Sequence, residues 1–250
     1  MSVPGYTAAS GPAIGGEPPS TSGAIALLNL EAQIDGQCRL AMQGGLSVAG
    51  RAGLIELIAL RGQILGRIAD FERADELAEQ LVRDAPAEGL AFLARARMRA
   101  TFHRFTEALD DLAVAERLGL DLAMVDAERA AIFQAVGRYD EALAILRQAA
   151  EHRASFERLG ALAGLHAERG EIAAAERLFD ASRARYRGVS PFPLALLDFW
   201  RGRMWLKQGD LTRARAWFDA AHRRLPAFAS AQRHLAEVEA ALGEVEAARP

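Results

Sequence analysis

The sequence predicts an all-α protein, a solenoid of about six helix-turn-helix units. Alanines recur along most of the chain with spacings of 34, 34, 33, 39 and 34 residues, and twelve residues before each alanine stands another small residue. A glycine precedes most of these alanines by five residues. A period close to 34 residues is typical of stacked helical repeats. The recurring alanines are Ala74, Ala108, Ala142, Ala175, Ala214 and Ala248.

The paired small residues mark the places where two helices of one unit cross. Small side chains on facing turns let two helix backbones approach closely, which large side chains would prevent. The partners of the alanines, in chain order, are Gly62, Ala96, Ala130, Ala163, Gly202 and Ala236.

The residue five positions before each alanine is expected to end the first helix of its unit. Glycine suits this place because a left-handed residue closes a helix there without a Cβ penalty. His103 takes the place of glycine in the second unit, and histidine enters the left-handed region more readily than most residues. The positions are Ala69, His103, Gly137, Gly170, Gly209 and Gly243.

The pattern divides the chain into three parts. Residues 1–23 are rich in Pro, Gly, Ser and Thr and are expected to form a flexible tail. Residues 24–53 are expected to form a degenerate helical pair that caps the array. The array itself covers 54–250, with an insertion of about five residues within 183–195, and its last unit breaks off early. The expected units are 55–88, 89–122, 123–155, 156–188, 195–228 and 229–250.

Three segments carry a resemblance to a known family: GRYDEALAILRQA (137–149), GDLTRARAWFDAA (209–221) and ADFERADELAEQL (69–81). They resemble the tetratricopeptide repeat, and the likeness extends from Leu54 to the C-terminus. It implies a right-handed superhelix whose first helices line a concave groove that holds a peptide or protein. The Lys and Asn residues with which some members clamp a C-terminal carboxylate are absent.

The resemblance also implies which residues face the groove. They stand just after the small residue of each first helix or one turn to either side of it, and small residues such as Gly160, Gly164 and Ala167 fill its middle. The partner-binding residues expected from this register are Gln63, Arg97, Gln134, Phe199, Arg203 and Arg233. Arg97 and Arg203 are candidates for forked hydrogen bonds to a carboxylate or to backbone carbonyls.

A second row of arginines stands immediately before the small residues, where the family commonly has Leu. It consists of Arg61, Arg95, Arg129 and Arg201. Two interpretations stay open. The arginines either lay their methylene stems along a neighbouring helix, with heads in water near Glu and Asp, or they bind an acidic partner.

Composition and motifs argue against several other functions. The chain carries 30 basic and 33 acidic residues, so no strong overall charge attracts nucleic acid or anionic lipid. The five histidines show no metal-ligand spacing, one cysteine cannot build a zinc cage, and no phosphate-binding loop or nucleophile elbow is present. We therefore expect no enzyme activity, no cofactor, no metal, no nucleic acid and no membrane contact.

The expected function is a scaffold or adaptor that holds a peptide or protein segment in the groove. A peptide- or small-ligand-sensing regulatory module and an accessory subunit of a biosynthetic enzyme assembly remain alternatives. The incomplete last unit suggests self-association through an uncapped C-terminal end. The start of the sequence lacks the features of a signal peptide, which favours the cytoplasm, and the preference for Arg over Lys is typical of a bacterial source.

Overall fold

The structure is a computed structural model that describes residues 19–243. Within these residues the chain forms twelve α-helices and no strand. The helices are α1 (Gly23–Met42), α2 (Val48–Leu65), α3 (Ile68–Asp84), α4 (Gly89–Thr101), α5 (Phe105–Arg117), α6 (Leu122–Ala135), α7 (Tyr139–His152), α8 (Phe156–Glu168), α9 (Ile172–Arg183), α10 (Phe192–Lys207), α11 (Leu211–Arg224) and α12 (Ala229–Ala241). The predicted all-α solenoid is confirmed. None of the helices in this described part combines the length and apolar character needed to cross a bilayer.

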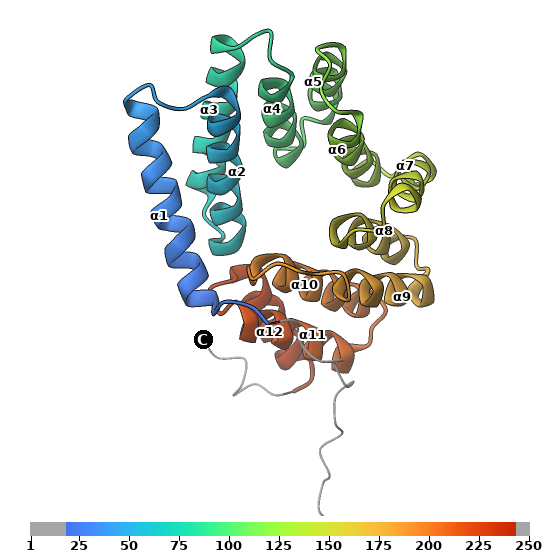
Figure 1. Cartoon of the computed structure of the whole chain (residues 1–250). Coiled ribbons are helices and arrows are strands. Elements are labelled where there is room, and N and C mark those ends of the chain that lie inside the picture. Colours follow the sequence, from blue (N-terminus) through green and yellow to red (C-terminus); the bar gives the residue numbers. More distant parts are fainter. Residues whose placement is uncertain (1–18, 244–250) are drawn as a thin grey trace, which may run out of the picture.

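Helices α2 to α11 form five helix pairs, in which the even-numbered helix precedes its partner. The even-numbered helices face the middle of the molecule and their partners form the outer layer (Figure 1). The small residues of the predicted register lie at the crossings of these pairs. Ala74, Ala108, Ala142, Ala175 and Ala214 are each fully buried.

The fifth pair shows why the small position is so restrictive. Gly202 of α10 faces the ring of Phe218 on α11, and a Cβ at Gly202 would lie 2.6 Å from Phe218 Cδ1. The phenylalanine fills the space that an alanine would otherwise take, so the helices keep their close approach only with glycine at this position.

Two predictions near the N-terminus are wrong. Residues 24–53 do not form a helical pair, because α1 is one helix that continues through Gly36 and residues 48–53 already belong to α2. Ala69 is not a turn residue but lies inside α3. The turn is made three residues earlier by Gly66, which has a φ of 65°. Of the expected tail, residues 1–18 lie outside the described part, while Gly23 is already helical.

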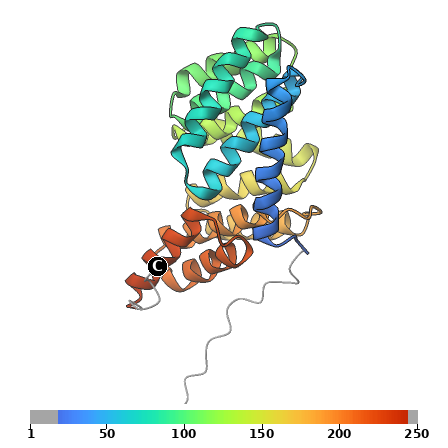
Figure 2. The same cartoon turned by 90° about the vertical axis from the view of Figure 1, so that its left-hand side faces the viewer.

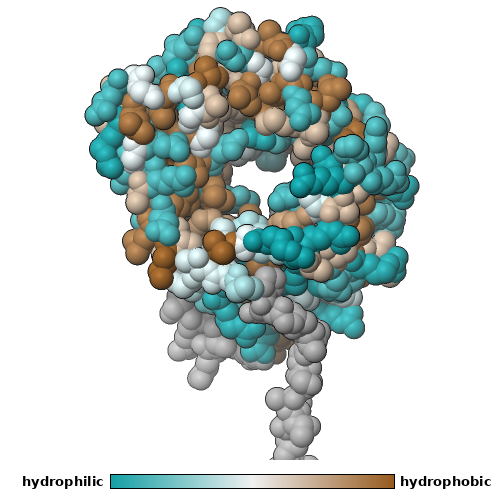
Figure 3. Space-filling view, viewed as in Figure 1, coloured by the Kyte–Doolittle hydropathy of each residue, from teal (hydrophilic) through white to brown (hydrophobic). Residues whose placement is uncertain are grey.

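The two ends of the array meet, so the solenoid closes into a ring (Figures 1 and 2). Helix α1 runs along the first pair and brings its beginning to the turn between α11 and α12. One apolar cluster joins both ends of the chain, and it includes Ala26, Leu30 and Ile34 of α1 together with Leu225 and Phe228 of that turn. The expected open groove is therefore the wall of a central opening, which Figure 3 shows passing through the molecule.

Backbone contacts fix this closure, which we call the seam (residues 20–23 against 189 and 224–225). Gly23 lies so close to the α11–α12 turn that a Cβ there would be 2.6 Å from the carbonyl oxygen of Arg224. The amide of Thr21 donates a hydrogen bond to the carbonyl of Val189, with an N–O distance of 2.8 Å. Val189 belongs to the predicted insertion, so this loop takes part in closing the ring.

The C-terminal end of the array is also covered in part. Helix α12 contacts α2 as well as α11, and its Ala231 and Val238 are buried in the cluster that joins the two ends. A Cβ at Gly66 would lie 3.3 Å from the Cβ of Ala229. The expected self-association through an exposed end loses this part of its basis. Ala248, at the second crossing position of the last unit, lies outside the described residues.

His103 adopts the left-handed conformation predicted for it, with a φ of 59°. We expect His103→Gly to leave the free energy of unfolding unchanged or to raise it by up to about 1 kcal/mol, because the Cβ strain disappears. Chemical denaturation measures this change. A clear loss of stability would instead show that the edge-to-face contact of the His103 ring with Phe105, at a centroid distance of 5.3 Å, outweighs the strain.

The seam leads to a second prediction: replacing two glycines of α1 with alanine should change the stability of the protein in opposite directions. Gly23→Ala places a methyl group against the backbone of Arg224 and should destabilise the protein, by about 1 to 3 kcal/mol. Gly36→Ala is the matched control: a Cβ there meets only the end of Arg39 at 4.0 Å, so it should stabilise the helix, by up to about 1 kcal/mol. Equal stabilisation of both variants, measured by chemical denaturation, would contradict the closed ring.

Candidate functional site

The wall of the central opening carries most of the residues that the sequence predicted to face a partner. Gln63 and Arg97 line a cavity of about 520 Å³ between α2 and α4. Gln134 and Arg203 line another cavity, of about 480 Å³, between α8 and α10. We call it the main cavity. The predicted register of the inner surface therefore agrees with the structure at these four positions.

Arg97 is engaged within the chain. Its Nε donates to Glu128 Oε1 on α6 at 2.7 Å, and its Nη1 pairs with Glu56 on α2. The guanidinium thus joins three consecutive inner helices, α2, α4 and α6. Binding a partner through Arg97 would require breaking these pairs.

The expectation that Phe199 offers an apolar surface to a partner is wrong. Phe199 is buried, and its ring packs against Phe218, Phe228 and His234 with centroid distances of 5.7, 5.1 and 5.2 Å. It is a core residue near the seam. Arg233 lies on α12, largely exposed, with its Nε 3.8 Å from Glu237 Oε1.

The second arginine row is engaged within the chain in the same way. Each of the four guanidiniums pairs with at least one carboxylate, and most of these pairs join two helices. The pairs include Arg61–Asp70 (2.5 Å), Arg95–Asp111 (2.7 Å), Arg95–Glu79 (3.0 Å), Arg129–Glu116 (2.7 Å) and Arg201–Asp180 (2.7 Å). These arginines tie neighbouring helices together, so the acidic-partner interpretation loses the free charges it needs.

The pKa of Glu79, which pairs with Arg95 and Arg99, is consistent with this role. Burial of the Glu79 carboxyl raises its pKa, but the hydrogen bonds and charges of Arg95 and Arg99 outweigh burial and hold the pKa below its usual value. A lowered pKa in the folded state means that the pairing stabilises the protein at neutral pH. The contribution is lost as the pH falls through the folded pKa.

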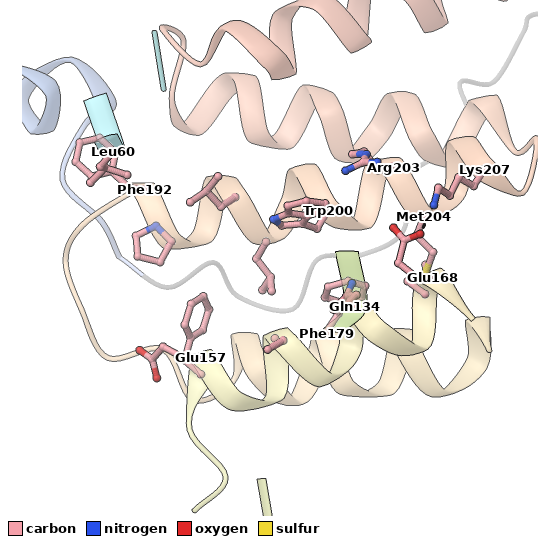
Figure 4. Close-up of a pocket in the computed structure, with 18 of the residues that line it drawn as sticks. Leu60, Gln134, Glu157, Glu168, Phe179, Phe192, Trp200, Arg203, Met204 and Lys207 are labelled. Atoms are coloured by element: carbon pink, nitrogen blue, oxygen red, sulfur yellow. Dashed lines mark hydrogen bonds and ion pairs between the residues drawn. The ribbon is translucent and has the colours of Figure 1, made fainter. Parts of the chain in front are cut away.

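The main cavity is lined mostly by apolar side chains (Figure 4). Helix α10 supplies one side of it, with Leu196, Trp200 and Met204 on a single helical stripe. Leu60 of α2 also lines the cavity. Trp200 is 43% exposed, which is unusual for so large an apolar side chain on a concave surface. Its ring also lies under the Arg203 guanidinium, 4.8 Å from centroid to Cζ.

Small residues of α8 form the opposite side of the main cavity. Gly160, Ala161, Gly164 and Ala167 line it, and a Cβ built at Gly164 would meet no atom within 4 Å. Packing therefore does not explain the glycine, which costs helix stability relative to alanine. The missing side chain leaves the backbone of α8 at Gly164 open to the cavity.

Some charged side chains at the cavity form ion pairs within the chain and others do not. Lys207 pairs with Glu168 at the far end, as the dashed line in Figure 4 shows. Among residues 19–243, Arg203 has no carboxylate within ion-pair distance. The negatively charged Glu157 at the near end has no basic group within that distance either. The cavity thus combines an apolar interior with one free charge of each sign at its two ends.

Sequence reasoning missed Trp200 because α10 is apolar on two faces. One stripe, with Phe199, packs on α11 and α12, and the adjacent stripe, with Trp200, lines the cavity. Neighbouring positions on a helix point about 100° apart, so the pattern cannot tell which stripe is buried when both are apolar. The PFP sequence at the start of α10 was the available signal.

Within the described part of the chain, no group of three or more His, Cys, Asp or Glu side chains is arranged to hold a metal ion.

Comparison with known proteins gives a consistent result. Residues 134–191 match the sequence model of the tetratricopeptide repeat family. No curated protein matches the sequence significantly.

Several solved structures share the fold at low sequence identity. A tetratricopeptide repeat protein from Parabacteroides merdae is 16% identical, with a TM-score of 0.59, and the match covers 88% of this chain and 90% of that one. The Cut9–Hcn1 hetero-tetramer of APC/C matches with a TM-score of 0.62 and 15% identity over 86% of this chain and 40% of its own. The apo form of the quorum sensor NprR from B. thuringiensis matches with a TM-score of 0.51 and 18% identity over 90% of this chain and 71% of its own.

Proposed function

We propose that this chain, which shares the fold of tetratricopeptide repeat proteins and matches their family model over residues 134–191, is a binding protein. It holds a polypeptide segment against the inner wall of its ring. The single observation that carries the proposal is the main cavity between α8 and α10, with the exposed Trp200 on one side and the bare backbone at Gly164 on the other. The cavity takes an apolar side chain of the partner, and no reaction is part of the proposal.

The cavity offers enough apolar surface for specific binding. Transferring a Leu or Phe side chain from water into such a recess contributes roughly 1.5 to 3 kcal/mol, which corresponds to a factor of about 10 to 150 in affinity. Binding energy at protein interfaces concentrates on a few aromatic and arginine residues in recesses. Trp200 and Arg203, stacked on each other at the cavity, are such a pair.

A ligand-sensing module is the second candidate. A volume of about 480 Å³ also lies within the range of small-molecule sites, and the apo quorum sensor NprR shares the fold. The accessory-subunit alternative, the cytoplasmic location and the bacterial source stay predictions from the sequence.

Gly164→Leu tests the proposed function. The new side chain points into open space, so we expect the helix to be as stable as before or more stable, by up to about 1 kcal/mol. It also fills the recess, so peptides selected by the wild-type protein from a random twelve-residue library should bind at least about tenfold more weakly to the variant. Fluorescence anisotropy with labelled peptides measures the affinity.

Gly53→Leu is the matched control, since Gly53 is a helical glycine of α2 with open space at its Cβ that lines none of these cavities. It should leave peptide binding intact. Equal binding by wild type and Gly164→Leu would place the partner elsewhere and refute the proposal. If no peptide binds wild type but a small apolar dye binds it and not Gly164→Leu, the ligand-sensing candidate is favoured.

A further inference from the structure

A second apolar cavity adjoins the main cavity. It has a volume of about 400 Å³ and lies between α6, α7 and the beginning of α8, where Leu122, Ile145 and Leu146 line it. Both cavities have Glu157 and Ala161 in their linings. They are therefore neighbouring recesses on the two sides of the first turns of α8, and one ligand can enter both.

Several charged side chains lie along this double recess, and two of them carry the argument. Glu157 stands between the two cavities and Arg203 lies on the far side of the main cavity, and neither has an ion pair within residues 19–243. Of the other charged groups of the linings, Lys207 pairs with Glu168 and Asp126 pairs with Arg129 at 2.6 Å. Arg158 of the second cavity donates a hydrogen bond to the carbonyl of Ala149 at 3.0 Å. The order along the wall is second cavity, Glu157, main cavity, Arg203.

The spacing of the two charges follows from helix geometry. Helices α8 and α10 run side by side in the same direction, since Glu157 lies at the Phe192 end and the Glu168–Lys207 pair joins the other ends (Figure 4). Arg203 is one turn before Lys207, which places it near the level of Gly164 on α8. Seven residues separate Glu157 from Gly164, or about 10 Å along a helix, which three residues of an extended chain span.

We propose that the ligand is an extended peptide with the pattern apolar, basic, apolar, acidic. The first apolar side chain enters the second cavity and the basic group pairs with Glu157. The second apolar side chain enters the main cavity against Trp200, and the acidic group, about three residues from the basic one, pairs with Arg203. This inference rests on the proposed function, because it specifies what the same wall recognises.

Synthetic labelled peptides of twelve residues test the pattern by fluorescence anisotropy. Each carries two Leu residues with Lys and Glu placed three residues apart in the proposed order, in the exchanged order, or with Gln at both places. Each is made in both chain directions, because the wall does not show which way the ligand runs. A partly exposed ion pair contributes up to about a factor of five in affinity, so the proposed order should bind about five- to twentyfold more tightly than the exchanged order.

The double variant Glu157→Arg with Arg203→Glu tests the charge pattern most directly. It should reverse the preference, binding the exchanged order more tightly than the proposed one. The matched control exchanges charges on the exposed surface of α7, Arg147→Glu with Glu151→Arg, and should keep the wild-type preference. A peptide in which Ser replaces the first Leu should bind wild type several-fold more weakly, because the second cavity stays empty.

The outcomes separate this inference from the proposed function. Equal affinity for all charge orders, with binding still lost in Gly164→Leu, would refute the charge pattern and leave the proposed function standing. A preference that does not change in the double variant would also refute the pattern. Binding that neither Gly164→Leu nor the double variant alters would refute both.

Discussion

The apolar contact between the first helix and the last ones is the constraint on which the rest of this structure depends. A stack of helical repeats is held together by contacts between neighbours, and an open stack can flex along its whole length. Here Ala26, Leu30 and Ile34 of α1 share one core with Leu225 and Phe228 at the other end of the chain. Because the ends are joined, the inner helices are held in a fixed arrangement, and so are the cavities between them.

The small residues and the arginines complete this arrangement between neighbouring helices. Fully buried alanines at the crossings bring the two helices of a pair together. Arginine–carboxylate pairs then tie consecutive helices, as Arg97 does between Glu56 and Glu128. Most arginines of the inner helices form such ion pairs. Arg203 has no ion pair among residues 19–243, and it lies beside the exposed ring of Trp200 at the main cavity.

The sequence predicted the parts of the fold that depend on local contacts. The crossing residues and the left-handed turn at His103 lie within one repeat period of their partners, so periodicity reveals them. The ring closure joins Gly23 to residues about 200 positions later, and no periodic signal marks such a contact. The N-terminal helix and the loop at Val189, which interrupt the repeat pattern, turned out to be the elements that close the ring.

The candidate site was predictable only in part, for a related reason. The register of the inner helices follows from the repeat, which is why Gln134 and Arg203 were placed on the correct wall. Whether an apolar residue on that wall is buried depends on what packs behind it. Helix α10 has the α11–α12 core behind one apolar stripe and open space in front of the other. Phe199, expected at the groove, is therefore buried, and Trp200 lines the cavity.

Site-specific photo-cross-linking tests the central claim, that a polypeptide binds on the inner wall, most directly. A photoreactive phenylalanine derivative replaces Trp200 in the main cavity or Arg177 on the exposed surface of α9, and each protein is irradiated in an extract of the source cells. The account predicts a discrete cross-linked protein adduct from position 200 and none from position 177. An adduct from position 177 alone would show that the partner binds the outer surface and would contradict the account.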